Sequence, residues 1–228
     1  MNILLIAGHG AGDPGACATH NGTRFREADE TRAMVQLLQE QLGRYEVNVG
    51  VYNTQRNAYA DAQAGKFKPA VLGYDYVLEL HFNAAGKREA DGRTTGTEIY
   101  VTTSERSVGV ELQIAAQLRK LGFTNRGVKR SNFSVIGQAK AAGVSSALLE
   151  VCFLDDPDDM QLYTGDRRAV ARAVADGIAA GFALDPRKRT DREIVQQAAG
   201  LSDKTMTYLA GYKYGTDLLR KLANAIGR

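Results

Sequence analysis

The chain has 228 residues, of which 44% are hydrophobic and 24% charged, and its formal net charge is +3. This composition excludes an intrinsically disordered protein, and no apolar run approaches the roughly 18 residues of a membrane span. The length is that of one ordinary domain with a small appendage.

The first part of the chain alternates between apolar strands and one helix. Asn2–Ala7 is a continuous apolar run that predicts a buried parallel strand, and the glycine-rich Gly8–Gly22 predicts a long loop. Glu27–Leu42 carries apolar residues at helical spacing before a stopping glycine. The alternating valines of Val47–Val51 predict a second strand. No Lys or Arg precedes the first apolar run, so a Sec signal peptide is not expected.

The same alternation continues to about residue 184. Tyr76–Phe82, Thr97–Thr102 and Ala147–Leu154 predict strands, whereas Val108–Leu121 and Arg167–Phe182 predict helices. Strands that alternate with helices indicate an α/β fold, which we expect to be a mostly parallel twisted sheet with helices on both faces.

The last part of the chain has a different pattern. Residues 185–190 (DPRKRT) predict a linker between an α/β domain at 1–184 and a small all-α C-terminal domain at 191–228. Helices are expected at Glu193–Ala199 and Asp203–Ala210, with a third at Asp217–Ile226 that ends at Gly227.

Positive charge is concentrated in this C-terminal part. Residues 185–228 hold nine Lys or Arg against five Asp or Glu, whereas residues 1–184 hold 20 against 21. A basic tail favours a polyanionic partner, but a solvated helical face explains the same charges.

Four residues with metal or acid–base chemistry fall at or near predicted strand ends. His9 follows the first strand, His81 lies on the strand at Tyr76–Phe82, and Glu150 interrupts an apolar strand. Glu27 opens the helix that follows the glycine-rich loop. Two imidazoles and one carboxylate form a known catalytic zinc set, and a second carboxylate could accept a proton from water. Each histidine equally fits a structural hydrogen bond, so spacing alone leaves both interpretations open.

Four segments in order resemble the zinc-dependent N-acetylmuramoyl-L-alanine amidases of the amidase-3 type. They are the opening motif Gly8–Ala16 (GHGAGDPGA), Arg26-Glu27, the His-x-Asn-Ala motif in Leu80–Ala84, and the glutamate motif Leu149–Leu154. The resemblance covers about residues 1–183. It implies the alternating α/β fold already predicted from the pattern.

The resemblance also implies a site and a reaction. His9, Glu27 and His81 would bind Zn²⁺, and Glu150 would be the catalytic carboxylate. The implied reaction cleaves the amide bond between N-acetylmuramic acid and L-alanine of bacterial peptidoglycan. Asn83 and Arg126 are expected to bind substrate, and Asn83 equally fits the support of a ligand or of the strand end.

Three further residues lie near these motifs. His20, in the loop between two expected ligands, fits either a substrate contact or an exposed loop position. Cys17 and Cys152 make no disulfide framework. A soft thiolate could compete for zinc, but a buried inert Cys152 is the favoured interpretation.

The expected biological role is that of a phage endolysin, a bacteriolytic enzyme kept in the host cytoplasm until a holin releases it to the cell wall. The tail would then bind the wall, teichoic acid or another wall polymer, or form a homo-oligomer. Its segment 198–226 partly resembles a phage-repressor helix-turn-helix. The alternative is therefore a regulatory or DNA-binding protein whose α/β domain senses a ligand. The sequence contains neither a Gly-x-Ser-x-Gly elbow nor a P-loop lysine.

Overall fold

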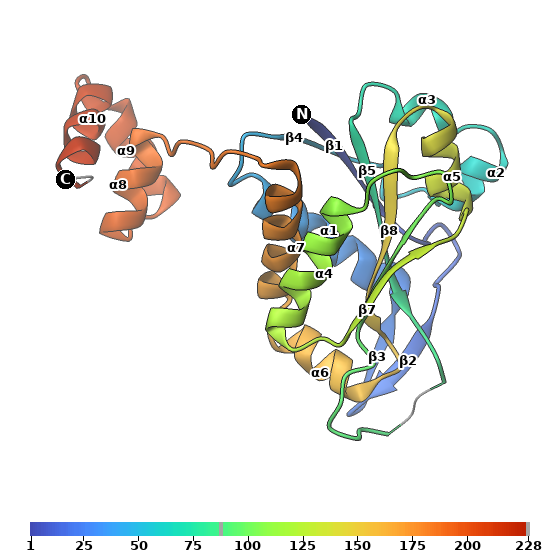
Figure 1. Ribbon diagram of the computed structural model, residues 1–228. Coiled ribbons are helices and arrows are strands. Elements are labelled where there is room, and N and C mark those ends of the chain that lie inside the picture. Colours follow the sequence, from blue (N-terminus) through green and yellow to red (C-terminus); the bar gives the residue numbers. More distant parts are fainter. Residues whose placement is uncertain (87–88, 227–228) are drawn as a thin grey trace. The chain divides into compact units, whose positions relative to one another are not determined.

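A six-stranded sheet forms the centre of the first unit in the computed structural model, which describes residues 1–86 and 89–226 (Figure 1). The strand order is β4-β1-β5-β8-β6-β7. The neighbours β4, β1, β5 and β8 are parallel, whereas β6 runs antiparallel to β8 and parallel to β7. The bounds are β1 Asn2–Ala7, β4 Asn48–Val51, β5 Tyr76–Asn83, β6 Thr97–Val101, β7 Asn125–Arg130 and β8 Ser145–Phe153.

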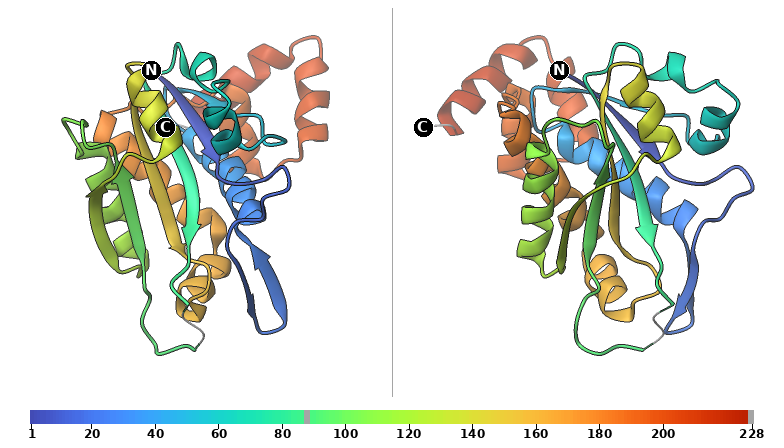
Figure 2. Two further views of the ribbon diagram at one scale, coloured as in Figure 1. Left: turned by 90° about the vertical axis from the view of Figure 1, so that its right-hand side faces the viewer. Right: turned by 45° about the vertical axis from the view of Figure 1, so that its right-hand side comes forward.

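Helices cover both faces of this sheet (Figures 1 and 2). One buried cluster joins the sheet to α1, α4 and α7, and a second joins the opposite face to α2, α3 and α5. The predicted α/β fold is therefore confirmed. The helix bounds are α1 Glu27–Leu42, α2 Ala58–Gln63, α3 Lys68–Val71, α4 Gly109–Leu121, α5 Ser134–Ala141, α6 Pro157–Gly165 and α7 Arg167–Phe182.

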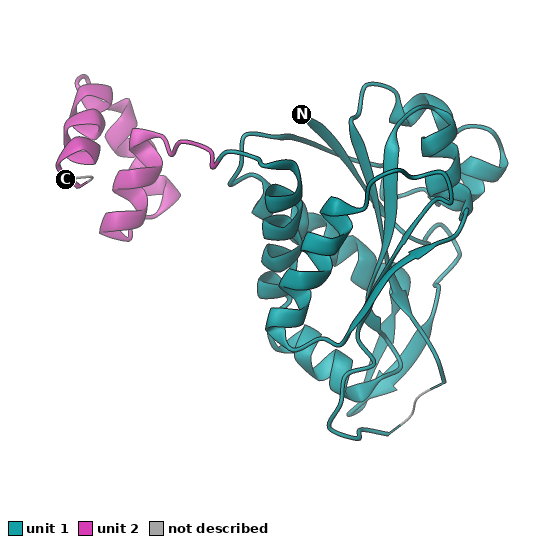
Figure 3. Ribbon diagram, in the orientation of Figure 1, with its two compact units in different colours: residues 1–185 teal, residues 186–228 magenta. Residues whose placement is uncertain are grey.

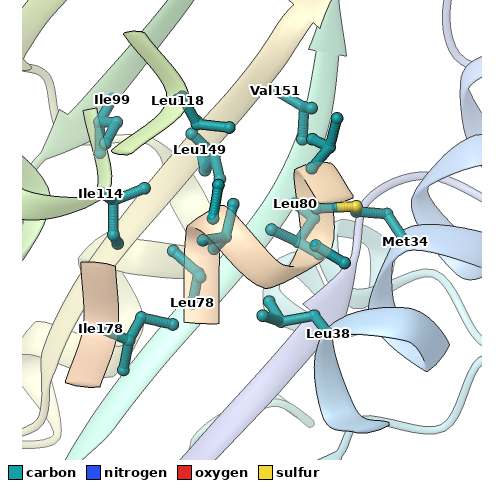
Figure 4. Packing of buried hydrophobic residues seen from close by; sticks show 14 of the residues in the cluster. Met34, Leu38, Leu78, Leu80, Ile99, Ile114, Leu118, Leu149, Val151 and Ile178 are labelled. Atoms are coloured by element: carbon teal, nitrogen blue, oxygen red, sulfur yellow. The ribbon is translucent and has the colours of Figure 1, made fainter. Parts of the chain in front are cut away.

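Alternation along each strand assigns side chains to the two faces. On β1, Ile3 and Leu5 pack toward α1, whereas Leu4 and Ile6 pack toward α2 and α5. The larger cluster, shown in Figure 4, brings Leu78 of β5 together with residues of the helices on its side of the sheet. A Leu or Ile that is fully removed from water contributes about 1.5–3 kcal/mol, so this face supplies most of the burial.

The opposite face of the sheet changes from apolar to polar side chains along the strands. Near the start of β5, Val77 belongs to the apolar cluster under α2 and α5. Two and four residues further along the same face stand Glu79 and His81. Glu150 on β8 pairs in register with His81, and Glu98 on β6 pairs with Glu150. The carboxyl ends of β5 and β8 therefore carry polar side chains in a row, where ligands bind in open α/β sheets.

The segment Gly8–Gly22, expected to be a loop throughout, contains a strand. β2 (Cys17–His20) pairs antiparallel with β3 (Thr23–Arg26) to form a hairpin that leads directly into α1. Asn21 and Gly22, both with positive φ, form its two-residue turn. The sequence patterns also missed β7, α5 and α6, because these elements are short and β7 is largely polar.

The second compact unit comprises Pro186–Arg228 and is coloured magenta in Figure 3. Its helices are α8 Asp191–Ala199, α9 Asp203–Gly211 and α10 Gly215–Ile226. Val195, Met206, Leu219 and Ala223 form their small core. Gly227, expected to end the last helix, lies outside the described residues. Within the described ranges, the structure contains no helix with the length and apolar character of a membrane span.

Candidate metal centre

Three segments that are distant in sequence bring His9, Glu27 and His81 together. Donor atoms of the three side chains all lie within 4.8 Å of one another. Glu27 is the centre of the cluster, because its Oε2 lies 3.1 Å from His9 Nε2 and its Oε1 lies 2.8 Å from His81 Nδ1. The Phe82 backbone N–H donates to the same Oε1 at 3.0 Å, and the Ala16 N–H donates to Oε2 at 2.9 Å. Backbone contacts therefore fix the carboxylate between the two rings.

Two glycines allow this close assembly. A Cβ added at Gly8 would lie 2.4–2.7 Å from ring atoms of His81. A Cβ added at Gly15 would lie 2.6 Å from Glu27 Oε2 and 2.7 Å from His9 Cδ2. His9 itself has φ of 60°, which is uncommon for a residue other than glycine. The loop is thus shaped to bring its backbone against the three side chains.

Neighbouring carboxylates determine which ring nitrogens face the centre. Asp13 Oδ2 lies 2.8 Å from His9 Nδ1, and the Gly15 N–H donates to its Oδ1 at 3.0 Å. Glu79 Oε1 lies 3.2 Å from His81 Nε2. These contacts leave Nε2 of His9 and Nδ1 of His81 directed at Glu27. A carboxylate behind a metal-binding imidazole is a common arrangement, since it fixes the tautomer and the ring plane.

The charges of the cluster stabilise one another. Burial of the His9 ring opposes its protonation, but hydrogen bonding to Glu27 and Asp13 outweighs burial and raises its pKa. For His81, burial is again overcome, here by Glu27 and Glu79, and the pKa is well above its ordinary value. Burial alone would raise the pKa of Glu27, whereas the two imidazoles hold it far below the usual range. The site is therefore built to hold a carboxylate beside positive charge.

These donors fit a divalent metal ion. Two imidazole nitrogens and one carboxylate oxygen match the three protein ligands of catalytic zinc sites, which leave a fourth position for water or substrate. Ligand atoms about 2.0–2.2 Å from a tetrahedral ion lie roughly 3.3 Å apart. The 2.8 Å and 3.1 Å separations join the two imidazoles to different oxygens of Glu27, and one ligand atom from each of the three side chains lies within 4.8 Å of the others. His9, Glu27 and His81 could therefore hold a metal once these ligand atoms draw closer together.

Glu150 lies beside this centre on β8, in register with His81. Among the described residues, its buried Oε2 has no hydrogen-bond partner. Burial is the main cause that raises its pKa to about 7, and His81 opposes the shift. A buried polar atom without a partner is costly. A carboxyl group with this pKa can both accept and release a proton near neutral pH.

Asn83 and Arg126, expected to bind substrate, both contact Glu98. Asn83 Nδ2 donates to Glu98 Oε1 at 2.8 Å, and Arg126 Nε donates to Oε2 at 2.7 Å. Lys129 pairs with Oε2, and the Tyr100 hydroxyl donates to Oε1 at 2.8 Å. Burial of Glu98 is outweighed by these contacts, so its pKa is lowered. The two substrate contacts stay predictions.

Sequence reasoning missed Glu98, although a signal for it existed. It is a charged residue within the strand Thr97–Val101, next to the apolar Ile99, and Glu150 was singled out as the same kind of interruption. Asp13 lies within the motif Gly8–Ala16, but the motif alone indicates no role for it. The remaining predicted residues have ordinary surroundings. His20 Nε2 lies 2.8 Å from the Leu154 carbonyl oxygen. Burial raises the pKa of the Cys152 thiol, which favours the interpretation of Cys152 as a buried, inert cysteine.

Comparisons with known proteins show a family and a fold to which this chain is similar. The family model described as N-acetylmuramoyl-L-alanine amidase (Amidase_3) matches residues 3–180. A curated relative, "Probable cell wall amidase LytH" of Staphylococcus saprophyticus, is 25% identical over 183 residues, which are 79% of this chain. The chain spans only 58% of the length of that relative.

Solved structures share the fold of the first unit. The catalytic domain of CwlV, an N-acetylmuramoyl-L-alanine amidase from Bacillus (Paenibacillus) polymyxa var. colistinus, superposes with a TM-score of 0.64 at 23% identity, covering 81% of this chain and 99% of that one. The CwlD amidase from Clostridioides difficile gives 0.64 at 22% identity, covering 80% and 98%. At these identities the likeness concerns the fold.

Proposed function

The chain belongs to the Amidase_3 family of N-acetylmuramoyl-L-alanine amidases, and from that premise we propose that it is a zinc-dependent peptidoglycan hydrolase. Its reaction would be cleavage of the amide bond between the lactyl group of N-acetylmuramic acid and L-alanine of the stem peptide. The observation that carries the proposal is the convergence of His9, Glu27 and His81 beside Glu150, whose Oε2 has no hydrogen-bond partner in the described part of the chain.

His9, Glu27 and His81 would hold the ion, while Asp13 and Glu79 keep the two rings in place. When bound, zinc supplies Lewis acidity that polarises the scissile carbonyl and lowers the pKa of water beside it. Backbone N–H groups and neighbouring carboxylates hold these ligands in place, so the ligands would not need to move during the reaction.

Glu150 would perform the proton transfers. Its carboxylate accepts the proton of the attacking water and then donates it to the leaving amine nitrogen as the C–N bond breaks. The pKa of about 7 suits both steps, although the positive charge of a bound metal would lower it. Glu98 on the neighbouring strand stays ionised through Arg126 and Lys129, so the two carboxyl groups have different protonation behaviour.

The proposal separates metal binding from proton transfer, and two variants test that separation. Glu150→Gln should retain one zinc per chain yet lose about 10²–10⁴-fold in amide cleavage, the usual contribution of general acid–base catalysis. His81→Ala should lose the zinc itself. Glu46→Gln, a change at an exposed carboxylate, is the matched control and should alter neither quantity.

Metal content measured by mass spectrometry and release of stem peptides from purified walls provide the two readouts. Full cleavage by Glu150→Gln would contradict the role of the carboxyl group. Equal zinc loss in both variants would mean that the roles have been assigned wrongly.

We further infer a role as a phage endolysin, with the enzyme kept in the host cytoplasm until a holin releases it. A catalytic unit followed by a short second unit supports this inference. Co-expression in a susceptible host, with and without a holin, tests it. Lysis should require the holin, and equal lysis without it would refute storage inside the cell.

The second unit would hold the enzyme on its polymer. Residues 186–228 carry nine Lys or Arg against four Asp or Glu, which suits anionic wall polymers such as teichoic acid. Tyr208, Tyr212 and Tyr214 are all exposed and offer aromatic faces. Self-association through this unit is the competing outcome, and a sedimentation measurement distinguishes the two. The family match over residues 3–180 disfavours the alternative of a DNA-binding regulator with a ligand-sensing α/β domain.

A further inference from the structure

The Arg32 side chain on α1 contacts the loop that carries the first metal ligand. Its Nη1 donates to the Gly8 carbonyl oxygen at 3.3 Å, and its Nη2 donates to the His9 carbonyl oxygen at 3.1 Å. Nη1 also donates at 2.9 Å to the carbonyl oxygen of Ala28, the residue after Glu27. One guanidinium group therefore joins the backbone at His9 to the backbone beside Glu27.

The same guanidinium group binds a third segment, which precedes α2. Its Nε donates to the Thr54 carbonyl oxygen at 2.9 Å, and its Nη2 donates to the Arg56 carbonyl oxygen at 3.3 Å. In the described part of the chain, every hydrogen-bond acceptor of Arg32 is thus a backbone carbonyl oxygen. The planar guanidinium suits such a cluster because it presents five N–H donors in a fixed fork, whereas a lysine presents all its donors from one nitrogen.

The backbone of the loop lies directly against this guanidinium group. A Cβ added at Gly10 would overlap Nη2 and Cζ of Arg32. Beside Gly10, His9 has φ of 60°, a conformation that a residue other than glycine keeps only where its surroundings hold it. The carbonyl groups of Gly8 and His9 belong to the two peptide groups on either side of the His9 Cα. By binding both, Arg32 fixes the direction in which the His9 side chain leaves the backbone.

The segment before α2 also holds the next part of the loop. The buried Asn57 caps α2, where its side chain accepts from the Ala60 N–H at 3.0 Å. Its Nδ2 donates to the Gly10 carbonyl oxygen and to Asp13 Oδ2, both at 3.2 Å. The loop is therefore held at several successive points by groups that lie outside the metal centre.

We propose that Arg32 is a positioning residue of the metal centre, which sets His9 relative to Glu27 before an ion binds. The inference rests on the proposed function, in which these two residues are zinc ligands. Ligands that are already ordered in the metal-free protein bind an ion more tightly, because no conformational freedom is lost on binding. A contact that only attached α1 to the segment before α2 would stabilise the fold and leave the metal affinity unchanged.

Two substitutions of Arg32 separate these roles. Arg32→Met keeps a long apolar side chain and removes every donor, whereas Arg32→Lys keeps the positive charge and removes the fork. Arg167→Lys is the matched control. Arg167 is also half-buried and also binds α1, where its Nε donates to Glu30 Oε2 at 3.1 Å, one turn from Glu27.

Three measurements on the full chain provide the readouts. Competition with a chromophoric chelator gives the zinc affinity, the visible absorption of bound Co²⁺ reports the ligand geometry, and the thermal midpoint of the metal-free protein reports the stability of the fold. Arg32→Met should weaken zinc binding by about 10–100-fold, the usual contribution of residues that orient metal ligands. Arg32→Lys should fall between Arg32→Met and the wild type. Both should alter the Co²⁺ spectrum at saturation, and Arg167→Lys should change neither the zinc affinity nor the spectrum.

Wild-type zinc affinity and an unchanged Co²⁺ spectrum in Arg32→Met would overturn the proposal, because Arg32 would then stabilise only the fold. If Arg32→Met does not fold, the same result in Arg32→Lys would overturn it. An equal loss of affinity in Arg167→Lys would also do so, since any loosening of α1 would then have the effect. A wild type that binds no zinc would instead refute the proposed metal centre. A wild type that binds zinc but cleaves no peptidoglycan would refute the proposed reaction and leave the role of Arg32 standing.

Discussion

The contact between Asp13 and His9 provides a sharp test of how the metal centre is oriented. Asp13→Asn preserves the size of the side chain and replaces one acceptor oxygen by a donor nitrogen. In the structure, Asp13 Oδ2 lies 2.8 Å from His9 Nδ1 and also accepts from Asn57 Nδ2 at 3.2 Å. The other oxygen, Oδ1, accepts from the Gly15 N–H at 3.0 Å.

Neither orientation of an asparagine amide satisfies all of these contacts. With its nitrogen at the Oδ2 position, the amide donates toward His9 Nδ1 and favours the tautomer whose proton is on Nε2, the atom that faces Glu27. With its nitrogen at the Oδ1 position, it opposes the Gly15 N–H. Residues behind metal-binding imidazoles typically contribute 10–100-fold to metal affinity. We therefore expect Asp13→Asn to weaken zinc binding by about 10–100-fold, or about 1.4–2.7 kcal/mol.

Competition with a chromophoric chelator at neutral pH measures this affinity. Asp29→Asn is the control. Asp29 is an exposed carboxylate that pairs with Arg26, and its substitution by Asn removes the same negative charge as Asp13→Asn. It should bind zinc as the wild type does. An Asp13→Asn protein with wild-type affinity would refute the orientation argument, and an equal loss in Asp29→Asn would show that net charge, not the tautomer, controls binding.

Three further predictions concern other parts of the chain. Gly15→Ala should weaken zinc binding measurably in the same competition assay, since φ of 66° disfavours a side chain there by about 1–2 kcal/mol and the new Cβ displaces Glu27. Burial raises the pKa of Glu111, whose carboxylate accepts from the Tyr76 hydroxyl at 2.7 Å. Because the pKa of Glu111 is higher in the folded than in the unfolded state, its contribution to the free energy of unfolding is complete below the unfolded-state pKa and is lost as pH rises through the folded-state pKa. Glu111→Gln should therefore increase the thermal midpoint of unfolding at pH 7 more than at pH 4. Tyr208→Ala should lower co-sedimentation of the full chain with walls about tenfold at unchanged turnover of a small soluble substrate, and full retention would argue against a wall-binding tail.

Most of the sheet was predictable, because strands such as Asn2–Ala7 are apolar and helices such as Glu27–Leu42 are periodic, whereas the polar strand β7 was missed. Asn2–Ala7 and Glu27–Leu42 have the same bounds in the sequence pattern and in the structure. The hairpin at Cys17–Arg26 was not predictable in this way. Its strands have four residues each and are mostly polar, so no apolar period of two emerges from the sequence. Its pairing depends on a two-residue turn at positive φ and on the loop that connects it to Glu27.

The metal centre was predictable only in part. Nothing in the spacing of His9, Glu27 and His81 indicates that they meet, and it was the resemblance of their motifs that grouped them. The structure brings them together through contacts that no local pattern encodes, such as the Phe82 and Ala16 N–H groups that donate to Glu27. Polar residues at the ends of buried strands are the signal that physical reasoning can use without a family.

Charged residues that interrupt buried strands occur on both β6 and β8, and they form a pair of carboxylates. Glu98 and Glu150 stand directly opposite each other on antiparallel strands, a position in which two negative charges repel. Arg126 and Lys129 keep Glu98 ionised, whereas burial raises the pKa of Glu150 to about 7. Environments that separate the pKa values of neighbouring carboxyl groups also separate their roles. The fixed negative charge of Glu98 therefore helps leave Glu150 as the group that exchanges a proton.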